Sequence, residues 1–423
     1  MSRHATTLGT ARSRLAEAPR GPCQDPEVTG PLHGIRVLDL TTVFSGPYAT
    51  LMLADLGADV VKVEVPGGDI VRRIGPGATM GPLFLAIGRN KRSVSLDLKH
   101  DEGRALLGRL IDSADVLMHN MRPAAAQRIG ADPATARARN PRLVHCAISG
   151  FGAGGPYEDL PAYDDVIQAA SGMAALQAQK GDPPTYVRTV VADKTAGLFA
   201  FGAVCAALVQ RDRTGEGATI EVPMYEAFTS FLLMEHLYGL TYDPPLGEAG
   251  YERVTSPDRR PFRTADGWIG VVFYNEAHWR GFFELIGRPE LITDPRFAEH
   301  RARIAHTDVL YAMVADAMAQ RTTAECLELL RELDVPAMPV QSIDEVLADP
   351  HLAAVGLFVA EDHPTEGRYT KVRNPIVFST GVDDGRVAPA AVGQHTREVL
   401  SELGCSETEI RRLVDEGVAQ TAD

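Results

Sequence analysis

The sequence predicts an α/β protein with two domains, a large one built on a parallel sheet and a smaller α+β one. Three observations predict this class. Short apolar strands alternate with helical segments from residue 34 to about residue 150, which is typical of βαβ units. The pattern changes after residues 219–224, where turn-rich sequence leads to an isolated strand and a helical series. Finally, 423 residues are enough for two separate cores.

The large domain is expected to begin with the apolar run 34–39, followed by a helix that ends near residue 57. Later strands are predicted at 59–64, 93–97, 115–119 and 142–149, with an amphipathic helix at 102–113. In the second region we expect a helix at 226–238, a turn-rich stretch at 240–263 and a strand at 268–273 in an antiparallel sheet. Helical patterns then continue to about residue 333, and two final helices are predicted at 392–403 and 407–416.

These elements give a domain plan. Residues 1–30, rich in Ala, Arg, Pro and Gly, are expected to form a flexible N-terminal extension. Residues 31–222 and 341–423 are assigned to the large, Rossmann-like domain, and residues 223–340 to the small domain.

Composition excludes several classes of partner. A formal charge of −14 repels nucleic acid and anionic membranes, so neither is an expected partner. The longest apolar stretch, residues 198–209, falls short of the roughly 20 residues that cross a bilayer. The five cysteines are scattered without zinc or disulfide spacing, which indicates reduced thiols in the cytoplasm and no metal site.

A dinucleotide site is the first hypothesis for a βαβ unit, and Glu64 ends the second strand where a ribose-binding acid would lie. The turn after the first strand, residues 41–47, contradicts it. This turn has one glycine, followed by Pro47, so the glycine pattern that lets the backbone approach a pyrophosphate is missing.

One carboxylate stands out at the start of an apolar helix. Asp193 precedes residues 198–209, which are apolar on every face and therefore belong in a core or an interface. Aspartate is a favoured N-cap residue, so Asp193 is either an ordinary cap or a nucleophile aimed into a cleft. The helical pattern alone leaves both open.

An ordered series of motifs carries a family resemblance. It runs through Ser45-Gly-Pro, Leu56-Gly-Ala-Asp-Val-Val-Lys-Val-Glu, Asn90-Lys-Arg-Ser, Ile148-Ser-Gly-Phe-Gly and Tyr163-Asp, and ends with Val392-Gly-Gln-His-Thr-Arg. In this order the motifs resemble the family III CoA-transferases, which include formyl-CoA:oxalate and carnitine CoA-transferases. The resemblance covers residues 31–415 and implies that the large domain binds CoA.

The resemblance also implies a mechanism. Asp193 matches the family's nucleophile, which attacks an acyl-CoA and becomes first an acyl anhydride and then an aspartyl-CoA thioester. At a helix N-terminus we expect its carboxylate to be stabilised as an anion, with free amides facing the charge of the transition state. The implied substrates are an acyl-CoA and a small carboxylic acid, with no permanently bound cofactor. An interlocked homodimer is implied as well.

Contacts to CoA are carried over position by position. Lys99 and Arg128 match phosphate-binding positions, and Ala162, Tyr163 and Asp164 match the region around the pantetheine and acyl groups. The full set of matched positions is Phe44, Ser45, Leu96, Asp97, Leu98, Lys99, Asn120, Met121, Arg122, Arg128, Ala162, Tyr163 and Asp164.

Two departures from the family pattern bear on the substrate, and two alternatives bear on the function. Phe44 and Val65 stand where oxalate-specific members have glutamine and arginine, and residues 251–261 carry Arg253, Arg259 and Arg260 in place of a glycine-rich loop. A 2-methylacyl-CoA racemase is the main alternative function, but that branch uses a His-Asp pair where this chain has Tyr163-Asp164. A non-catalytic CoA-binding role is the other alternative.

Overall fold

A seven-stranded sheet forms the centre of the first of two compact units. The structure, a computed structural model, describes residues 30–178, 182–379 and 387–422. Cys23 and all but the last residue of the predicted extension 1–30 lie outside these ranges. The first unit runs to Met173 and includes Tyr186–Phe231 and the chain from Pro350 onward; the second comprises Ala174–Thr185 and Leu232–Asp349.

The strand order of this sheet is β12-β3-β2-β1-β4-β5-β6. Its six parallel strands are β1 (Arg36–Asp39), β2 (Asp59–Glu64), β3 (Lys91–Leu96), β4 (Val116–His119), β5 (Val144–Ser149) and β6 (Thr219–Pro223). The short β12 (Ala419–Gln420) adds antiparallel to β3. The order 3-2-1-4-5-6 is that of doubly wound, Rossmann-like sheets, so the large parallel sheet predicted from sequence is confirmed.

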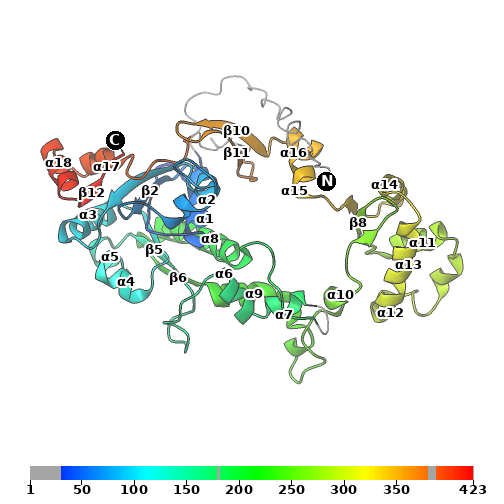
Figure 1. The fold of residues 1–423 in the computed structure, drawn as a ribbon. Coiled ribbons are helices and arrows are strands. Elements are labelled where there is room, and N and C mark those ends of the chain that lie inside the picture. The colour runs from blue at the N-terminus through cyan, green and yellow to red at the C-terminus, as the bar shows by residue number, and fades with distance from the viewer. Residues whose placement is uncertain (1–29, 179–181, 380–386, 423) are drawn as a thin grey trace, which may run out of the picture. The chain divides into compact units, whose positions relative to one another are not determined.

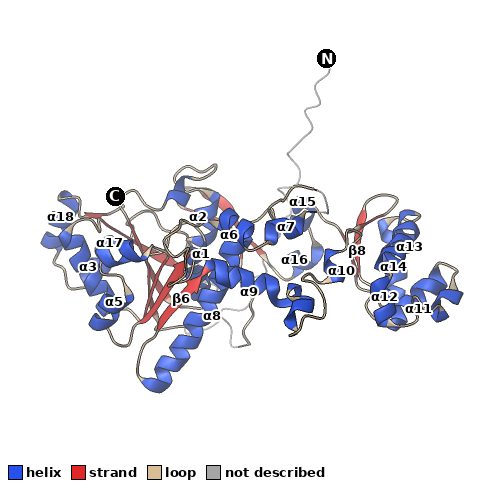
Figure 2. Cartoon of the chain, turned by 90° about the horizontal axis from the view of Figure 1, so that it is seen from below, coloured by secondary structure: helices blue, strands red, loops and turns tan. Residues whose placement is uncertain are grey.

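Helices cover both faces of the sheet (Figure 2). One face packs against α1 (Ser45–Asp55) and α8 (Val191–Thr214), with Leu53, Ala196 and Val204 fully buried. The other face packs against α3 (Asp101–Asp112), α5 (Pro133–Arg139), α17 (Thr396–Glu402) and α18 (Glu407–Asp415). Strands buried on both faces are rich in valine and isoleucine, and the three valines of Asp59–Glu64 predict this strand with its observed bounds.

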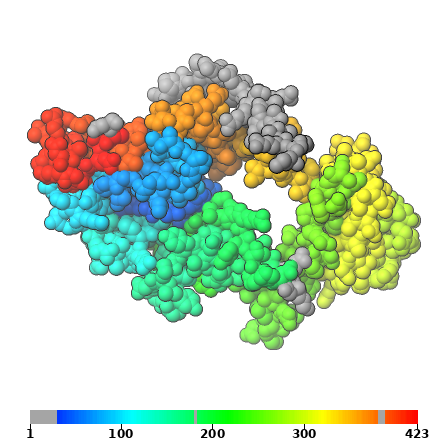
Figure 3. Space-filling view, viewed as in Figure 1, coloured from blue at the N-terminus to red at the C-terminus, as the bar shows by residue number. Residues whose placement is uncertain are grey.

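The C-terminal segment completes this unit, and Figure 3 shows it in red against the cyan part of the chain. Arg412 on α18 pairs with Glu102 on α3, and Thr396 Oγ1 accepts a hydrogen bond from the Ser95 amide of β3. The other elements of the unit are η2 (Ile70–Arg73), α2 (Pro82–Ile87), α4 (Pro123–Arg128), α6 (Asp164–Ala170), α16 (Pro350–Ala354), β10 (Phe358–His363) and β11 (Gly367–Val372).

The second unit has its own core and its own sheet (Figure 1). Strands β7 (Phe262–Arg263), β8 (Trp268–Val271) and β9 (Ala337–Pro339) pair antiparallel, as predicted for residues 268–273. Phe282, Phe283 and Phe297 are among its buried side chains. Its helical elements are η3 (Tyr238–Thr241), α10 (Glu252–Thr255), α11 (Glu276–Leu285), η4 (Pro289–Thr293), α12 (His300–Ala305), α13 (Thr307–Ala319), α14 (Thr323–Glu332) and α15 (Ile343–Leu347).

Two helices run across the unit boundaries. α7 (Met173–Gln177) begins at the end of the first unit's N-terminal part, and α9 (Met224–His236) spans the boundary at Phe231. Met224 and Phe228 at the start of α9 lie in the core of the first unit. The contact-based boundaries therefore fall after Phe231 and before Pro350, whereas the sequence placed them at 222/223 and 340/341.

Helix α8 is longer than the sequence analysis allowed. It has 24 residues and passes a length and composition test for a membrane span, so the expectation of only short apolar stretches is wrong on length. Core helices of soluble proteins pass the same test, and 44% of the apolar window is buried in this protein. Leu198, Phe199 and Val209 stay about half exposed.

Candidate active site

A pocket of ≈ 210 Å³ lies at the carboxyl edge of the large sheet, where the chain leaves β1 and β4. The connections from these neighbouring strands run to opposite faces of the sheet, and such a switch point is where open α/β sheets bind ligands. Its walls come from the segments that follow β1, β4 and β5 and from the first turn of α8. The lining residues are Thr42, Val43, Phe44, Ser45, Asn120, Met121, Arg122, Pro123, Ile148, Ser149, Gly150, Glu158, Leu160, Pro161, Ala162, Tyr163, Asp193 and Met224.

Asp193 reaches this pocket from the third position of α8, because the helix begins at Val191. The N-cap residue is Val190, which has no side-chain capping bond, so the interpretation of Asp193 as the cap is wrong. One turn later, Gly197 lets α8 approach α1 closely. A Cβ at position 197 would lie 2.7 Å from the carbonyl oxygen of Ser45.

Asp164 supplies the missing cap from another helix. Its Oδ1 accepts hydrogen bonds from the amides of Ala192 (2.7 Å) and Asp193 (3.1 Å), and its side chain is buried. The side-chain nitrogen Nε2 of Gln168 donates to Asp164 Oδ2, while Gln168 Oε1 accepts from the backbone amide of Val187. The expected role of Asp164 in lining the acyl region is therefore corrected, since its carboxylate is directed at the helix terminus.

The environment of Asp193 raises its pKa to about 7, mainly through burial and then through the neighbouring charge of Asp164. Among the described residues, none forms a hydrogen bond or ion pair with its carboxylate. Stabilisation of this anion by the helix terminus was expected and is not observed. Asp164 occupies the amides of residues 192 and 193, which would otherwise favour the charged form.

The pocket brings together eight of the predicted site residues and leaves six outside. Those inside are Phe44, Ser45, Asn120, Met121, Arg122, Ala162, Tyr163 and Asp193. Leu96, Asp97, Leu98, Lys99, Arg128 and Asp164 do not line it. Leu96 is a correction, because its side chain is fully buried in the sheet core and has no surface for a ligand.

Lys99 and Arg128 are both exposed, Lys99 just after β3 and Arg128 at the end of α4. Lys99 follows β3, which is separated from β4 by β2 and β1. Three strand spacings put the two strand ends roughly 14 Å apart. A ligand that contacts both the pocket and Lys99 must therefore be long.

Asn120 was predicted as a ligand contact, and the structure gives its side chain a second role. Asn120 Oδ1 accepts from the Thr42 amide (2.9 Å), and Asn120 Nδ2 donates to the Thr42 carbonyl (2.8 Å). This backbone-like pairing ties the segment after β4 to the segment after β1. Sequence reasoning missed Thr42, Val43 and Glu158 as wall residues, because nothing in their local pattern marks them.

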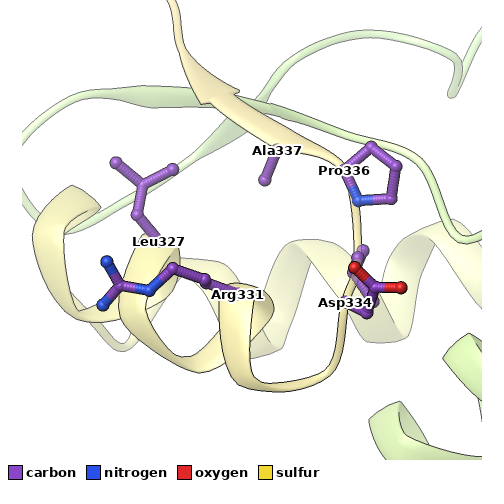
Figure 4. Close-up of a pocket in the computed structure, with 6 residues that line it drawn as sticks. Leu327, Arg331, Asp334, Pro336 and Ala337 are labelled. Carbon is purple, nitrogen blue, oxygen red and sulfur yellow. The ribbon is translucent and has the colours of Figure 1, made fainter.

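The second unit contains a shallow hollow of ≈ 380 Å³ between the end of α14 and β9 (Figure 4). Its walls are Leu327, Arg331, Asp334, Val335, Pro336 and Ala337, none of which was a predicted site residue. No group of three or more His, Cys, Asp or Glu side chains placed to hold a metal ion occurs within residues 30–178, 182–379 and 387–422.

Comparison with known proteins identifies the family and agrees with the fold. Residues 32–396 match the family described as CoA-transferase family III. Succinate–glutarate CoA-transferase of Agrobacterium fabrum is 34% identical over 89% of this chain and 97% of its own length. Formyl-CoA:oxalate CoA-transferase of Streptomyces avermitilis is also 34% identical, over 92% of this chain and 100% of its own.

Solved structures show the same relationship. A CAIB/BAIF family protein from Brucella suis superposes with a TM-score of 0.75 at 30% identity, covering 89% of this chain and 100% of that one. Rv3272 from Mycobacterium tuberculosis gives a TM-score of 0.77 at 31% identity, covering 88% and 99%. With this fold, this pocket and a family match over most of its length, the chain belongs to CoA-transferase family III and is an enzyme of that family.

Proposed function

We propose that this enzyme moves CoA from an acyl-CoA to a free carboxylic acid with Asp193 as the covalent nucleophile. The observation that carries the proposal is a half-buried carboxylate with a raised pKa in the pocket at the switch point. A desolvated carboxylate is more basic and less shielded by water than an exposed one, which makes it a better nucleophile. Glu158, the other carboxylate in the pocket wall, lies on an exposed loop.

The reaction needs only exchanges of acyl bonds. An oxygen of Asp193 attacks the thioester carbonyl and the C–S bond breaks. CoA departs as a thiolate, and the acyl group remains on Asp193 as a mixed anhydride. The thiolate then attacks the aspartyl carbonyl and expels the donor's carboxylate, which leaves an aspartyl-CoA thioester. The acceptor carboxylate reverses the two steps, so Asp193 is regenerated without net proton transfer.

The length of CoA suits the layout of the edge. We expect Lys99 and Arg128, which are both exposed, to bind phosphates of CoA while the thioester end enters the pocket. The apolar wall residues Phe44, Met121 and Tyr163 would exclude water from the anhydride.

The test is trapping of the intermediate. The enzyme is incubated with a panel of acyl-CoA donors and hydroxylamine, digested, and mapped by mass spectrometry. We expect a hydroxamate on the peptide that contains Asp193, and none in the Asp193→Ala variant, which should still bind CoA. Label on another residue, or exchange by the variant at the wild-type rate, would contradict the proposal.

A racemase would give a different result. Incubation with one epimer of a 2-methylacyl-CoA in deuterated water, without an acceptor acid, should leave the α-hydrogen in place. Incorporation of deuterium under these conditions would support the isomerase instead.

The interlocked homodimer and the cytoplasmic location are also proposals. The half-exposed Leu198, Phe199 and Val209 on α8 support a further contact surface. Sedimentation at decreasing concentration tests the dimer, which should yield no folded monomer. Cell fractionation tests the location; Cys146, Cys205, Cys326 and Cys405 are free thiols, as expected of a reducing compartment.

A further inference from the structure

We propose that Lys62 and Asp69 are positioning residues for CoA transfer, because they hold the loop 41–45 in a strained conformation that forms one wall of the pocket around Asp193. The inference rests on the proposed role of Asp193. The loop 41–45 connects β1 to α1, and four of its five residues line the pocket.

Strain in this loop is located at Val43, whose φ is 67°. A β-branched side chain is a true outlier in the left-handed region, where its Cβ crowds the backbone. Such a conformation persists only where the surroundings impose it, and these cases concentrate at functional sites. Something must therefore hold Val43 in place.

Besides the pairing of Asn120 with Thr42, two buried side chains hold the backbone on either side of that residue. The Val43 amide donates to Asp69 Oδ2 (3.2 Å), and Lys62 Nζ donates to the carbonyl of Thr41 (2.8 Å). Lys62 Nζ also lies 3.5 Å from Asp69 Oδ2, so the two holders are themselves an ion pair. Together they fix the backbone on both sides of Thr42.

Burial makes this arrangement costly. Lys62 is 2% exposed and Asp69 is 5% exposed. Burying an ion pair gives no stability advantage over well-packed apolar side chains of similar size. Fixing a strained loop at the pocket wall is a function that an apolar pair cannot perform, because it has no group to bond the backbone.

Only two contacts separate this ion pair from the nucleophile. The loop ends at Ser45, whose carbonyl oxygen packs against Gly197, one helical turn after Asp193. There is no space for a Cβ at Gly197, so a shift of Ser45 must be met by a shift of α8. A displacement of about 1 Å between reacting groups costs on the order of 100-fold in rate.

The test compares Lys62→Met and Asp69→Asn with Arg89→Met. Arg89 forms an equally buried ion pair with Asp55 (2.7 Å), but at the opposite end of α1, so it controls for the loss of a buried pair. We expect kcat to fall about 10-fold to 100-fold in both test variants, with KM for the acyl-CoA within about threefold of wild type. In Arg89→Met, kcat should stay within about threefold of wild type while thermal stability falls.

A rescue variant separates positioning from general damage. Glycine adopts positive φ without strain, so Val43→Gly removes the tendency of the loop to relax. We therefore expect Lys62→Met to lower kcat by a factor at least about threefold smaller in the Val43→Gly background than in the wild-type background, each double or single variant being compared with its own parent. If Lys62→Met does not fold, Asp69→Asn takes its place in this cycle.

The inference is overturned if both test variants retain wild-type kcat, or if Arg89→Met loses as much kcat as they do. Absence of rescue by Val43→Gly would also overturn it. Failure of the proposed nucleophile is a separate result, because it would appear as an unlabelled Asp193 in the active wild-type enzyme.

Discussion

Two carboxylates of the first unit, Asp39 and Asp193, lie in opposite electrostatic environments. Beneath the loop 41–45, Asp39 is fully buried and accepts hydrogen bonds from Thr41, Thr50 and Lys91. Burial raises its pKa, but Lys91 and Lys62 outweigh burial and leave the pKa far below its usual range. In the pocket, no cation of the described residues forms an ion pair with Asp193, whose pKa is raised to about 7 by burial and by Asp164.

This contrast shows that partners decide the state of a buried acid. The anion at Asp39 is surrounded by donors and serves to fix the start of α1. The acid at Asp193 is left without donors among the described residues, so its charged form is stabilised less than that of Asp39. A carboxylate that is stabilised less binds an electrophile more readily.

Removing Asp193 should have the largest effect on activity. We expect Asp193→Asn to lower kcat by at least about 1,000-fold, since the nucleophile is lost.

The stability of the Asp193→Asn variant should instead increase. The raised pKa contributes stability below about pH 4 that is lost as pH rises through 7, so the variant should be about 1–3 kcal/mol more stable than wild type at pH 8 and equal at pH 4. Urea unfolding at both pH values checks this.

Removing Asp39 tests the stabilised carboxylate of the comparison. Asp39→Ala leaves the ammonium of Lys91 buried beside a cavity, and we expect a loss of about 3–5 kcal/mol in the free energy of unfolding. Chemical denaturation measures it. A loss below about 1 kcal/mol would show that the network under the loop 41–45 is unimportant for folding.

The pH dependence of activity sharpens the comparison. If Asp193 must be ionised, kcat/KM should rise with pH through about 7 and then level off. Asp164→Asn removes the neighbouring negative charge while keeping an oxygen for the α8 amides, so the rise should move to lower pH. An unmoved profile would mean that Asp164 does not act on the titrating group.

His119 provides a further test, of stability alone, as a buried base that forms no ion pair among the described residues. Burial first, and then His145, lowers its pKa to about 3. The unfolded chain takes up a proton below about pH 6.5 that the folded chain refuses until about pH 3. Stability should therefore fall with decreasing pH across this range, by up to about 1.4 kcal/mol per pH unit from this group. His119→Gln should flatten the slope measured by denaturation between pH 6.5 and 4.5.

The sequence was a good guide to the strands and a partial guide to the site. A valine-rich segment predicted β2 with its observed bounds, and motif order led to Asp193 and to seven other residues that line the pocket. Leu96 was misplaced, because a motif match cannot tell which side of a strand faces the core. The interpretation of Asp193 as the cap missed the observed N-cap, Val190, by three residues, since the last residues before a helix lack a distinct pattern.

By itself the sequence determined the parallel strands and the family, and it predicted Asp193 as the nucleophile, because apolar periodicity and local motifs are properties of neighbouring residues. The tertiary structure alone decided that Asp164 caps α8, that Asn120 pairs with Thr42, and that Lys62 reaches the carbonyl of Thr41. Each of these contacts joins segments 21 or more residues apart. The contacts of Asn120 and Lys62 exist because the strand order sets β1 between β2 and β4, and no local pattern in the chain encodes that order.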